Sequence, residues 1–126
     1  MHATSYLEHA NLQVQDIDEA SHFILTALPD WRLRGQGDMD WFGKPVQWRH
    51  LGNDHAYIAL QSGATEPAAN WRNCSANVKH LGMVVASLPA LLMRLEAAGY
   101  LPDHWGASHP HRRSVYFLNR DGIQFE

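Results

Sequence analysis

The chain has 126 residues, of which 45% are hydrophobic and 18% are charged, and its formal net charge is −3 with histidine neutral. This composition is typical of one ordinary globular domain. It lacks the basic clusters of a nucleic-acid-binding protein and any apolar run of membrane-spanning length. We therefore expect neither nucleic acid nor a membrane as a partner.

The single cysteine, Cys74, excludes an internal disulfide and is typical of a reducing compartment. The first residues are polar and contain no apolar core of a signal peptide. Together these features predict a cytoplasmic protein. Nine histidines are many for so short a chain, so a metal site is the first functional hypothesis, and the spacing of the histidines must test it.

The first half begins with alternating polar and apolar residues over 6–15, which predicts a strand that carries His9. Asp16, with Glu19 three residues later, has the spacing of a helix start. An apolar stripe at helical spacing follows, and Pro29 ends it. Further strands are expected at 31–34, 41–51 (interrupted near 43–45) and 55–61, with turns at 35–38 and 52–54.

Residues 62–77 are rich in Gly, Pro, Ala, Asn and Ser without periodicity, which predicts a linker. A second strand with a histidine near its start is then expected at 78–85. Ser87 can cap the following helix, with Pro89 in its first turn and Gly99 at its end.

A polar and aromatic loop is expected at 100–113, and the chain closes with a hairpin over 114–126 that turns at 119–122. Glu126 ends this apolar hairpin. A lone buried carboxylate is costly, so Glu126 should face solvent, a basic side chain or a metal ion.

The two halves form an internal repeat of strand, helix and about three strands, with module one at 1–61, the linker at 62–77 and module two at 78–126. One such half cannot cover its own apolar sheet face, so the two should pair within a single domain. The expected fold class is α+β: two βαβββ modules that pair into a cupped mixed sheet with the helices outside.

The repeat matches His9 with His80 at the strand starts, and Gln61 with Glu126 at the strand ends. Two imidazoles, a carboxylate and an amide oxygen are suitable ligands for a divalent ion such as Fe, Zn, Ni or Mn. An open coordination position would allow Lewis-acid chemistry.

The strand starts Leu-Glu-His9 and Val-Lys-His80, and the ending Val-Tyr-Phe-Leu-Asn-Arg-Asp-Gly-Ile-Gln-Phe-Glu126, resemble the vicinal oxygen chelate superfamily. This superfamily includes glyoxalase I, extradiol dioxygenases, and fosfomycin- and bleomycin-resistance proteins. The resemblance implies a cupped sheet around a metal ion, with ligand positions at His9, Gln61, His80 and Glu126. It also implies a homodimer, often with a metal site built from both subunits.

The resemblance has departures. Asn119 and Arg120 stand where the family commonly has Asp and Pro, and Gln61 stands where glyoxalase I usually has Glu. The family's last strand normally continues beyond the position of Glu126. The set of two histidines and one glutamate used by extradiol dioxygenases and fosfomycin-resistance enzymes is complete.

Two functions from different classes follow. The first is a metal-dependent enzyme of the glyoxalase or dioxygenase type, whose small substrate chelates the ion through vicinal oxygens. The alternative is a metal-free drug-binding protein of the bleomycin-resistance type. A third possibility, thiol transfer to a phosphonate antibiotic, would need a basic phosphonate pocket and a potassium loop, which the sequence does not supply.

No catalytic residue is identified from the sequence. Five residues are candidates for substrate contact, either as aromatic pocket walls or as polar groups near the closing hairpin: Trp48, Tyr57, His109, Arg113 and Tyr116. His104, His109 and His111 lie in the 100–113 loop, where they could cover the pocket or simply face solvent. Any of them could act as a general acid or base.

Overall fold

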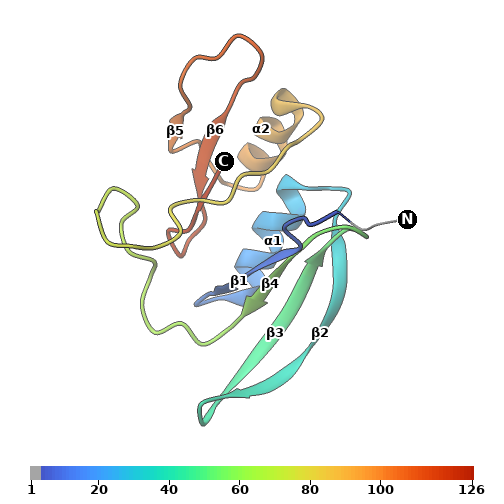
Figure 1. The fold of residues 1–126 in the computed structure, drawn as a ribbon, viewed down its shortest axis with the longest axis vertical. Coiled ribbons are helices and arrows are strands. Elements are labelled where there is room, and N and C mark those ends of the chain that lie inside the picture. Colours follow the sequence, from blue (N-terminus) through green and yellow to red (C-terminus); the bar gives the residue numbers. More distant parts are fainter. Residues whose placement is uncertain (1–3) are drawn as a thin grey trace.

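The computed structural model describes residues 4–126. The first half contains β1 (His9–Gln13), α1 (Ile17–Ala27), β2 (Arg32–Trp41), β3 (Lys44–Gly52) and β4 (Tyr57–Gln61). The second half contains α2 (Leu88–Ala97), β5 (His104–Trp105), β6 (Val115–Leu118) and β7 (Gln124–Phe125). The strands form one sheet with the order β1-β4-β3-β2 and another with the order β5-β6-β7 (Figure 1).

The second half repeats the topology of the first. β1 runs parallel to its neighbour β4, and Leu81 likewise forms a parallel bridge with Phe125 of β7. The order of residue 81, β7, β6 and β5 therefore matches the order β1-β4-β3-β2. The predicted α+β class is confirmed. No ladder joins the two sheets within residues 4–126.

Both helices begin and end where the sequence predicted. The Asp16 side chain accepts hydrogen bonds from the backbone N–H groups of residues 18 and 19 at the start of α1. Ser87 accepts one from the N–H of Ala90 at the start of α2. Gly99 follows α2 with a φ of +91°, a left-handed conformation that favours glycine. Neither helix, of 11 and 10 residues, has the length and apolar character to cross a bilayer.

The turn predicted at 35–38 is wrong, because these residues lie inside the continuous strand β2. Their glycines allow the Trp48 indole of β3 to lie against the strand: a Cβ on Gly37 would be 2.9 Å from the Trp48 Nε1. The actual turn is at Phe42 and Gly43, both with positive φ. The turn was predicted wrongly because glycines that make room for a neighbouring ring cannot be distinguished from turn glycines by sequence alone.

The strand predicted at 78–85 is reduced to the single Leu81 bridge. Its backbone pairs with residues 124–126 alone: Leu81 N–H donates to the Gln124 carbonyl, Glu126 N–H donates to the Leu81 carbonyl, and Met83 N–H donates to the Glu126 carbonyl. The other edge of this segment has no strand partner among residues 4–126. Residues 62–77 contain no helix or strand, as predicted.

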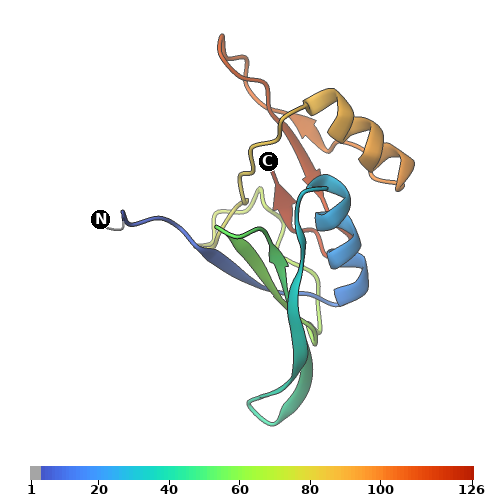
Figure 2. The same ribbon diagram turned by 90° about the vertical axis from the view of Figure 1, so that its right-hand side faces the viewer.

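The two halves share one apolar core. The Phe23 ring of α1 lies 4.8 Å from the Tyr100 ring, 5.1 Å from Phe125 and 6.5 Å from Phe117 (centroid distances), so the first helix packs on the second half. α1 and α2 also lie side by side in both ribbon views (Figures 1 and 2).

Polar contacts join the closing turn of the second half to the start of α1. The Arg120 N–H donates to Glu19 Oε1 at 2.6 Å, and the Gln15 N–H donates to Asp121 Oδ1 at 2.7 Å. Glu19 and Asp121 are both buried. Loss of hydration raises the pKa of Glu19 above its usual value, and the Arg120 hydrogen bond opposes this rise.

Candidate functional site

His80 and Glu126 form one pair of candidate ligands. The His80 Nε2 lies 3.3 Å from Glu126 Oε1, with 38% of the His80 side chain and 19% of the Glu126 side chain exposed. The Glu126 backbone is held by its hydrogen bonds to Leu81 and Met83. An imidazole and a partly exposed carboxylate are ordinary ligands of a divalent ion, so this pair fits part of a metal site.

His9 and Gln61 lie in the other half. The His9 ring stacks on the Tyr57 ring at 4.7 Å and 6°, and its Nδ1 is 3.0 Å from Glu8 Oε1. Gln61 is 3% exposed, and its Oε1 accepts a hydrogen bond of 3.1 Å from Asn11 Nδ2. Both line a shallow hollow of about 350 Å³.

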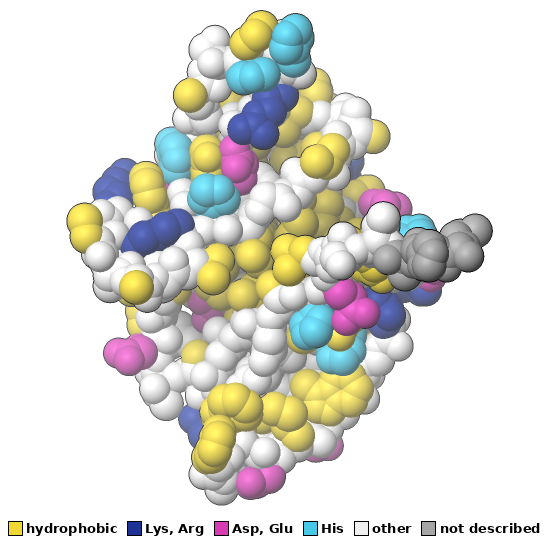
Figure 3. All heavy atoms as spheres, viewed as in Figure 1, with side chains coloured by type: hydrophobic (Ala, Val, Ile, Leu, Met, Phe, Trp, Pro, Cys, Tyr) yellow, Lys and Arg dark blue, Asp and Glu magenta, His cyan; other side chains and the backbone are white. Residues whose placement is uncertain are grey.

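The four predicted ligands are not gathered in one place. Within residues 4–126, no three His, Cys, Asp or Glu side chains lie close enough together to hold a metal ion. The space-filling view shows separate groups of histidine and acidic side chains on the two halves (Figure 3). Each chain therefore carries two separate pairs, His80 with Glu126 and His9 with Gln61.

The helix caps confirm that His9 and His80 occupy equivalent positions. His9 lies seven residues before the cap Asp16, and His80 lies seven residues before the cap Ser87. The segments that carry these two histidines therefore lead into their helices over the same number of residues.

The sheet register identifies a different partner for Glu126 than the repeat had suggested. In the first half, Asn11, two residues after His9, pairs with Ala59. In the second half, Gly82, two residues after His80, lies opposite Glu126, one step beyond the Leu81–Phe125 bridge. The sheet equivalent of Glu126 is thus Ala59, whose methyl group cannot bind a metal ion. Gln61 lies two residues further along the same face.

A column of stacked rings borders the His80–Glu126 pair. The Tyr116 ring meets the His80 ring edge-on at 5.3 Å, and His104 stacks on Tyr116 at 4.3 Å and 7°. Trp71 stacks at 4.8 Å on His104, whose Nδ1 is 2.7 Å from Asp103 Oδ2. Loss of hydration and the Glu126 carboxylate raise the pKa of the Tyr116 phenol, which therefore stays protonated at neutral pH.

Sequence reasoning missed the roles of Trp71 and Asp103 in this column. Trp71 belongs to a linker without periodicity, so no pattern placed it near His104. The only sequence signal was the position of Tyr116 beside the closing hairpin; in the structure Tyr116 pairs with His104, the residue after Asp103.

The aromatic candidates of the first half line the shallow hollow. His50 lies 4.8 Å from Trp48 and 4.6 Å from Tyr57, between the two rings. Burial, followed by the nearby Arg34 and His9, lowers the pKa of His50, so it is neutral at neutral pH. The other two candidates, His109 and Arg113, lie away from this hollow and line a larger cavity that Glu126 also borders.

Solved structures match this fold over nearly its whole length. A glyoxylase/bleomycin resistance protein/dioxygenase domain from Frankia sp. EAN1pec is 24% identical, with a TM-score of 0.75 over 98% of this chain and 95% of that chain. A glyoxalase family protein from Bacillus cereus is 16% identical, with a TM-score of 0.75 over 98% and 93% of the two chains. A variant of the fosfomycin resistance protein FosX from Listeria monocytogenes, complexed with Mn(II) and 1S,2S-dihydroxypropylphosphonic acid, is 18% identical, with a TM-score of 0.72 over 98% and 90%.

Neither models of protein families nor curated protein sequences match the chain. At these identities the structural matches show the fold. The expected fold is thereby confirmed: the chain has the fold of these glyoxalase-type and FosX structures.

Proposed function

We propose that the protein is a metal-dependent enzyme of the glyoxalase or dioxygenase type. Its ligands would be His9, His80 and Glu126, and its small substrate would chelate the ion through vicinal oxygens. The observation that carries this proposal is the 3.3 Å approach of His80 Nε2 to Glu126 Oε1. A relative by fold, FosX, was solved with Mn(II), and the donor set suits Fe, Zn, Ni or Mn.

We further propose that His9 of one copy completes the site of a second copy in a homodimer. The outer edges of β1 and of the segment around Leu81 have no strand partner among residues 4–126. Apolar side chains near these edges are exposed: Leu7 is 84% exposed and Val84 is 100% exposed. Pairing the two edges between copies would cover these side chains and bring His9 to the His80–Glu126 pair.

A bound divalent ion would polarise a substrate oxygen. The Tyr116 phenol, protonated at neutral pH, can donate a hydrogen bond beside Glu126. Trp48 and Tyr57 offer flat apolar walls, and His109 and Arg113 offer polar contacts for substrate. Isomerase or lyase chemistry of the glyoxalase type and ring-cleaving dioxygenation are both compatible with these proposed metal ligands and substrate contacts.

A metal-free binding protein is the second candidate, and one observation favours it. Ala59 occupies the sheet position equivalent to Glu126, so the strand paired with β1 offers His9 no carboxylate there; the carboxylate in contact with the His9 ring is that of the preceding residue, Glu8. The same hollow is lined by Trp48, His50 and Tyr57. Such aromatic walls suit a flat ligand without any ion.

Elemental analysis of untagged protein distinguishes these functions. The enzyme proposal expects about one metal ion per chain, lost in His80→Ala. If the wild type holds no metal after incubation with Fe²⁺, Ni²⁺, Mn²⁺ and Zn²⁺, the binding-protein function replaces it.

Co-expression of two inactive variants tests the shared site. A dimer of His9→Ala with Glu126→Gln would retain one complete site, from His9 of one copy and the His80–Glu126 pair of the other, and therefore about half of the metal. The matched control, His80→Ala with Glu126→Gln, would retain none. Equal metal loss in both mixtures would contradict a site built from two copies.

A further inference from the structure

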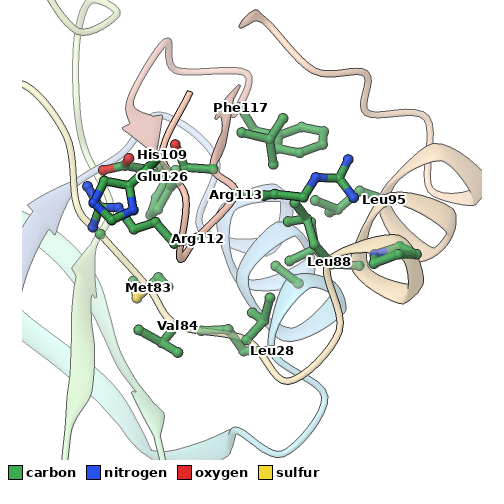
Figure 4. Close-up of a pocket in the computed structure, with 18 of the residues that line it drawn as sticks. Leu28, Met83, Val84, Leu88, Leu95, His109, Arg112, Arg113, Phe117 and Glu126 are labelled. Carbon is green, nitrogen blue, oxygen red and sulfur yellow. The ribbon is translucent and has the colours of Figure 1, made fainter. Parts of the chain in front are cut away.

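A second, larger cavity lies away from the His9 hollow. Its volume is about 820 Å³, and it is bordered by α1, α2, residues 82–85 and the loop at 109–114 (Figure 4). This volume is within the usual range of small-molecule sites. Most of its wall is aliphatic or aromatic, including Phe23, Leu28, Met83, Leu88, Leu95 and Phe117. Such a wall suits an apolar ligand.

The rim of this cavity carries two cationic groups, Arg112 and Arg113, beside the imidazoles of His109 and His111. Among residues 4–126, neither arginine forms an ion pair: the Arg113 guanidinium lies over the Trp105 ring at 5.7 Å. Arg113 extends across the cavity toward Leu95, whereas Arg112 points to the other side, beside His109 (Figure 4).

The positive charge at this rim contrasts with the net negative charge of the chain. The chain as a whole has a formal charge of −3. Glu126 also lines the cavity, but its carboxylate faces His80 at 3.3 Å. Two guanidinium groups without carboxylate partners, beside an apolar wall, complement a ligand that is anionic at one end and apolar at the other. Guanidinium groups bind carboxylates through paired, charge-assisted hydrogen bonds.

We propose that this cavity binds an amphipathic carboxylate, such as a medium-chain alkyl carboxylate. The tail lies against Leu28, Leu88 and Phe117, and the headgroup lies at Arg113, with Arg112 adding to the positive potential. This cavity shares His109, Arg113 and Glu126 with the residues of the proposed enzyme site, but the ligand proposed here goes beyond that function and needs no metal ion. Its test is therefore independent of the metal analysis.

The test uses full-length protein treated with EDTA and isothermal titration with dodecanoate below its micelle concentration. We expect saturable binding of about one dodecanoate per chain. Dodecyltrimethylammonium, which has an alkyl tail of nearly the same length and the opposite charge, should bind at least about tenfold more weakly. Arg113→Gln should weaken dodecanoate binding by about tenfold, whereas Arg72→Gln, which removes the same charge outside the cavity, should leave it unchanged.

The apolar wall is tested with a variant that fills the cavity. Ala27→Phe should abolish dodecanoate binding, and Met93→Phe, at a position of α2 that is 73% exposed, should not. Leu88→Trp provides a second filling variant if Ala27→Phe does not fold. Absence of saturation, equal binding of the cationic analogue, or unchanged binding in a folded filling variant would overturn the proposal. A filling variant that changes only the oligomeric state would instead assign the cavity to contact with a second copy.

Discussion

The two halves have the same strand order but very different sheets. In the first half, β2 and β3 have ten and nine residues and pair along almost their whole length. In the second half, β5 and β7 have two residues each, and the strand around Leu81 is a single bridge. Backbone ladders therefore cannot be the main support of the second half. Its support comes from the α1 side chains and from the polar contacts of the closing turn.

The largest expected effect comes from removing the ring that joins the halves. Phe23→Ala deletes the contacts to Tyr100, Phe117 and Phe125 at a position that is 2% exposed. We expect a loss of about 3–5 kcal/mol in the free energy of unfolding, because a buried aromatic leaves a cavity. Urea denaturation followed by circular dichroism measures this loss.

Phe42→Ala is the matched control, since the Phe42 side chain is 91% exposed at the tip of the β2–β3 hairpin, and it should change stability little. Denaturation of Phe23→Ala in two separate steps, with the first half retaining its midpoint, would contradict a core shared by both halves.

Glu19 is expected to have the next largest effect. Its Oε1 accepts the Arg120 N–H, while its buried Oε2 has no hydrogen-bond partner among the described residues. Glu19→Ala leaves the Arg120 N–H without its acceptor and should cost about 1–3 kcal/mol. Glu19→Gln keeps an acceptor oxygen and should cost less. Urea midpoints of the two variants provide the comparison.

The raised pKa of Glu19 also predicts how stability depends on pH. The folded state binds this proton more tightly than the unfolded state, whose pKa is near 4.5. The contribution of Glu19 to stability is therefore greatest below pH 4.5 and is lost as the pH rises through the folded pKa. Glu19→Gln should remove this component of the pH profile. An identical profile in wild type and Glu19→Gln would show that the carboxylate is hydrated in solution.

The sequence predicted the parts of the fold that depend on local pattern. Asp16 and Ser87 start their helices, and the hairpin turn at 119–122 lies where expected. The prediction was wrong at Gly35 and Gly37, because their role depends on Trp48 of the neighbouring strand. It also extended the strand around Leu81 too far, because strand pairing depends on a partner that alternation alone does not reveal.

The candidate site was predictable only in part. The repeat placed His80 next to Glu126 correctly, since both lie on one pair of neighbouring strands. It matched Gln61 with Glu126 because both end their strands, whereas the register matches Ala59. The position of Trp71 over His104 could not be predicted, because the linker has no periodic pattern.

Ala59→Glu tests whether Ala59 in the first half occupies the position that Glu126 has in the second half. If Ala59 is the equivalent of Glu126, a carboxylate there would lie on the same face as His9 and supply a fourth ligand to the proposed shared site. We expect metal affinity to rise by about tenfold, a change that even outer partners of metal ligands can produce. Competition with a chromophoric chelator measures the affinity. Gln61→Glu, two residues further along the strand, should change the metal affinity less. A larger gain in Gln61→Glu than in Ala59→Glu would show that Gln61, as the repeat suggested, is the equivalent of Glu126.

The smallest expected effect on stability lies at the tip of the β2–β3 hairpin, which is exposed and lies outside the shared core. Phe42 and Gly43 have φ angles of +49° and +87°, the pattern of a two-residue turn that favours Asn-Gly. Phe42→Asn should raise stability by about 0.5 kcal/mol, because a left-handed backbone costs most side chains about 1–2 kcal/mol and asparagine less. The loss of the exposed edge contact between Trp41 and Phe42, 5.0 Å between centroids, offsets part of this gain. A small increase in the urea midpoint is expected, whereas a decrease would show that this aromatic pair stabilises the hairpin more than its backbone strains it.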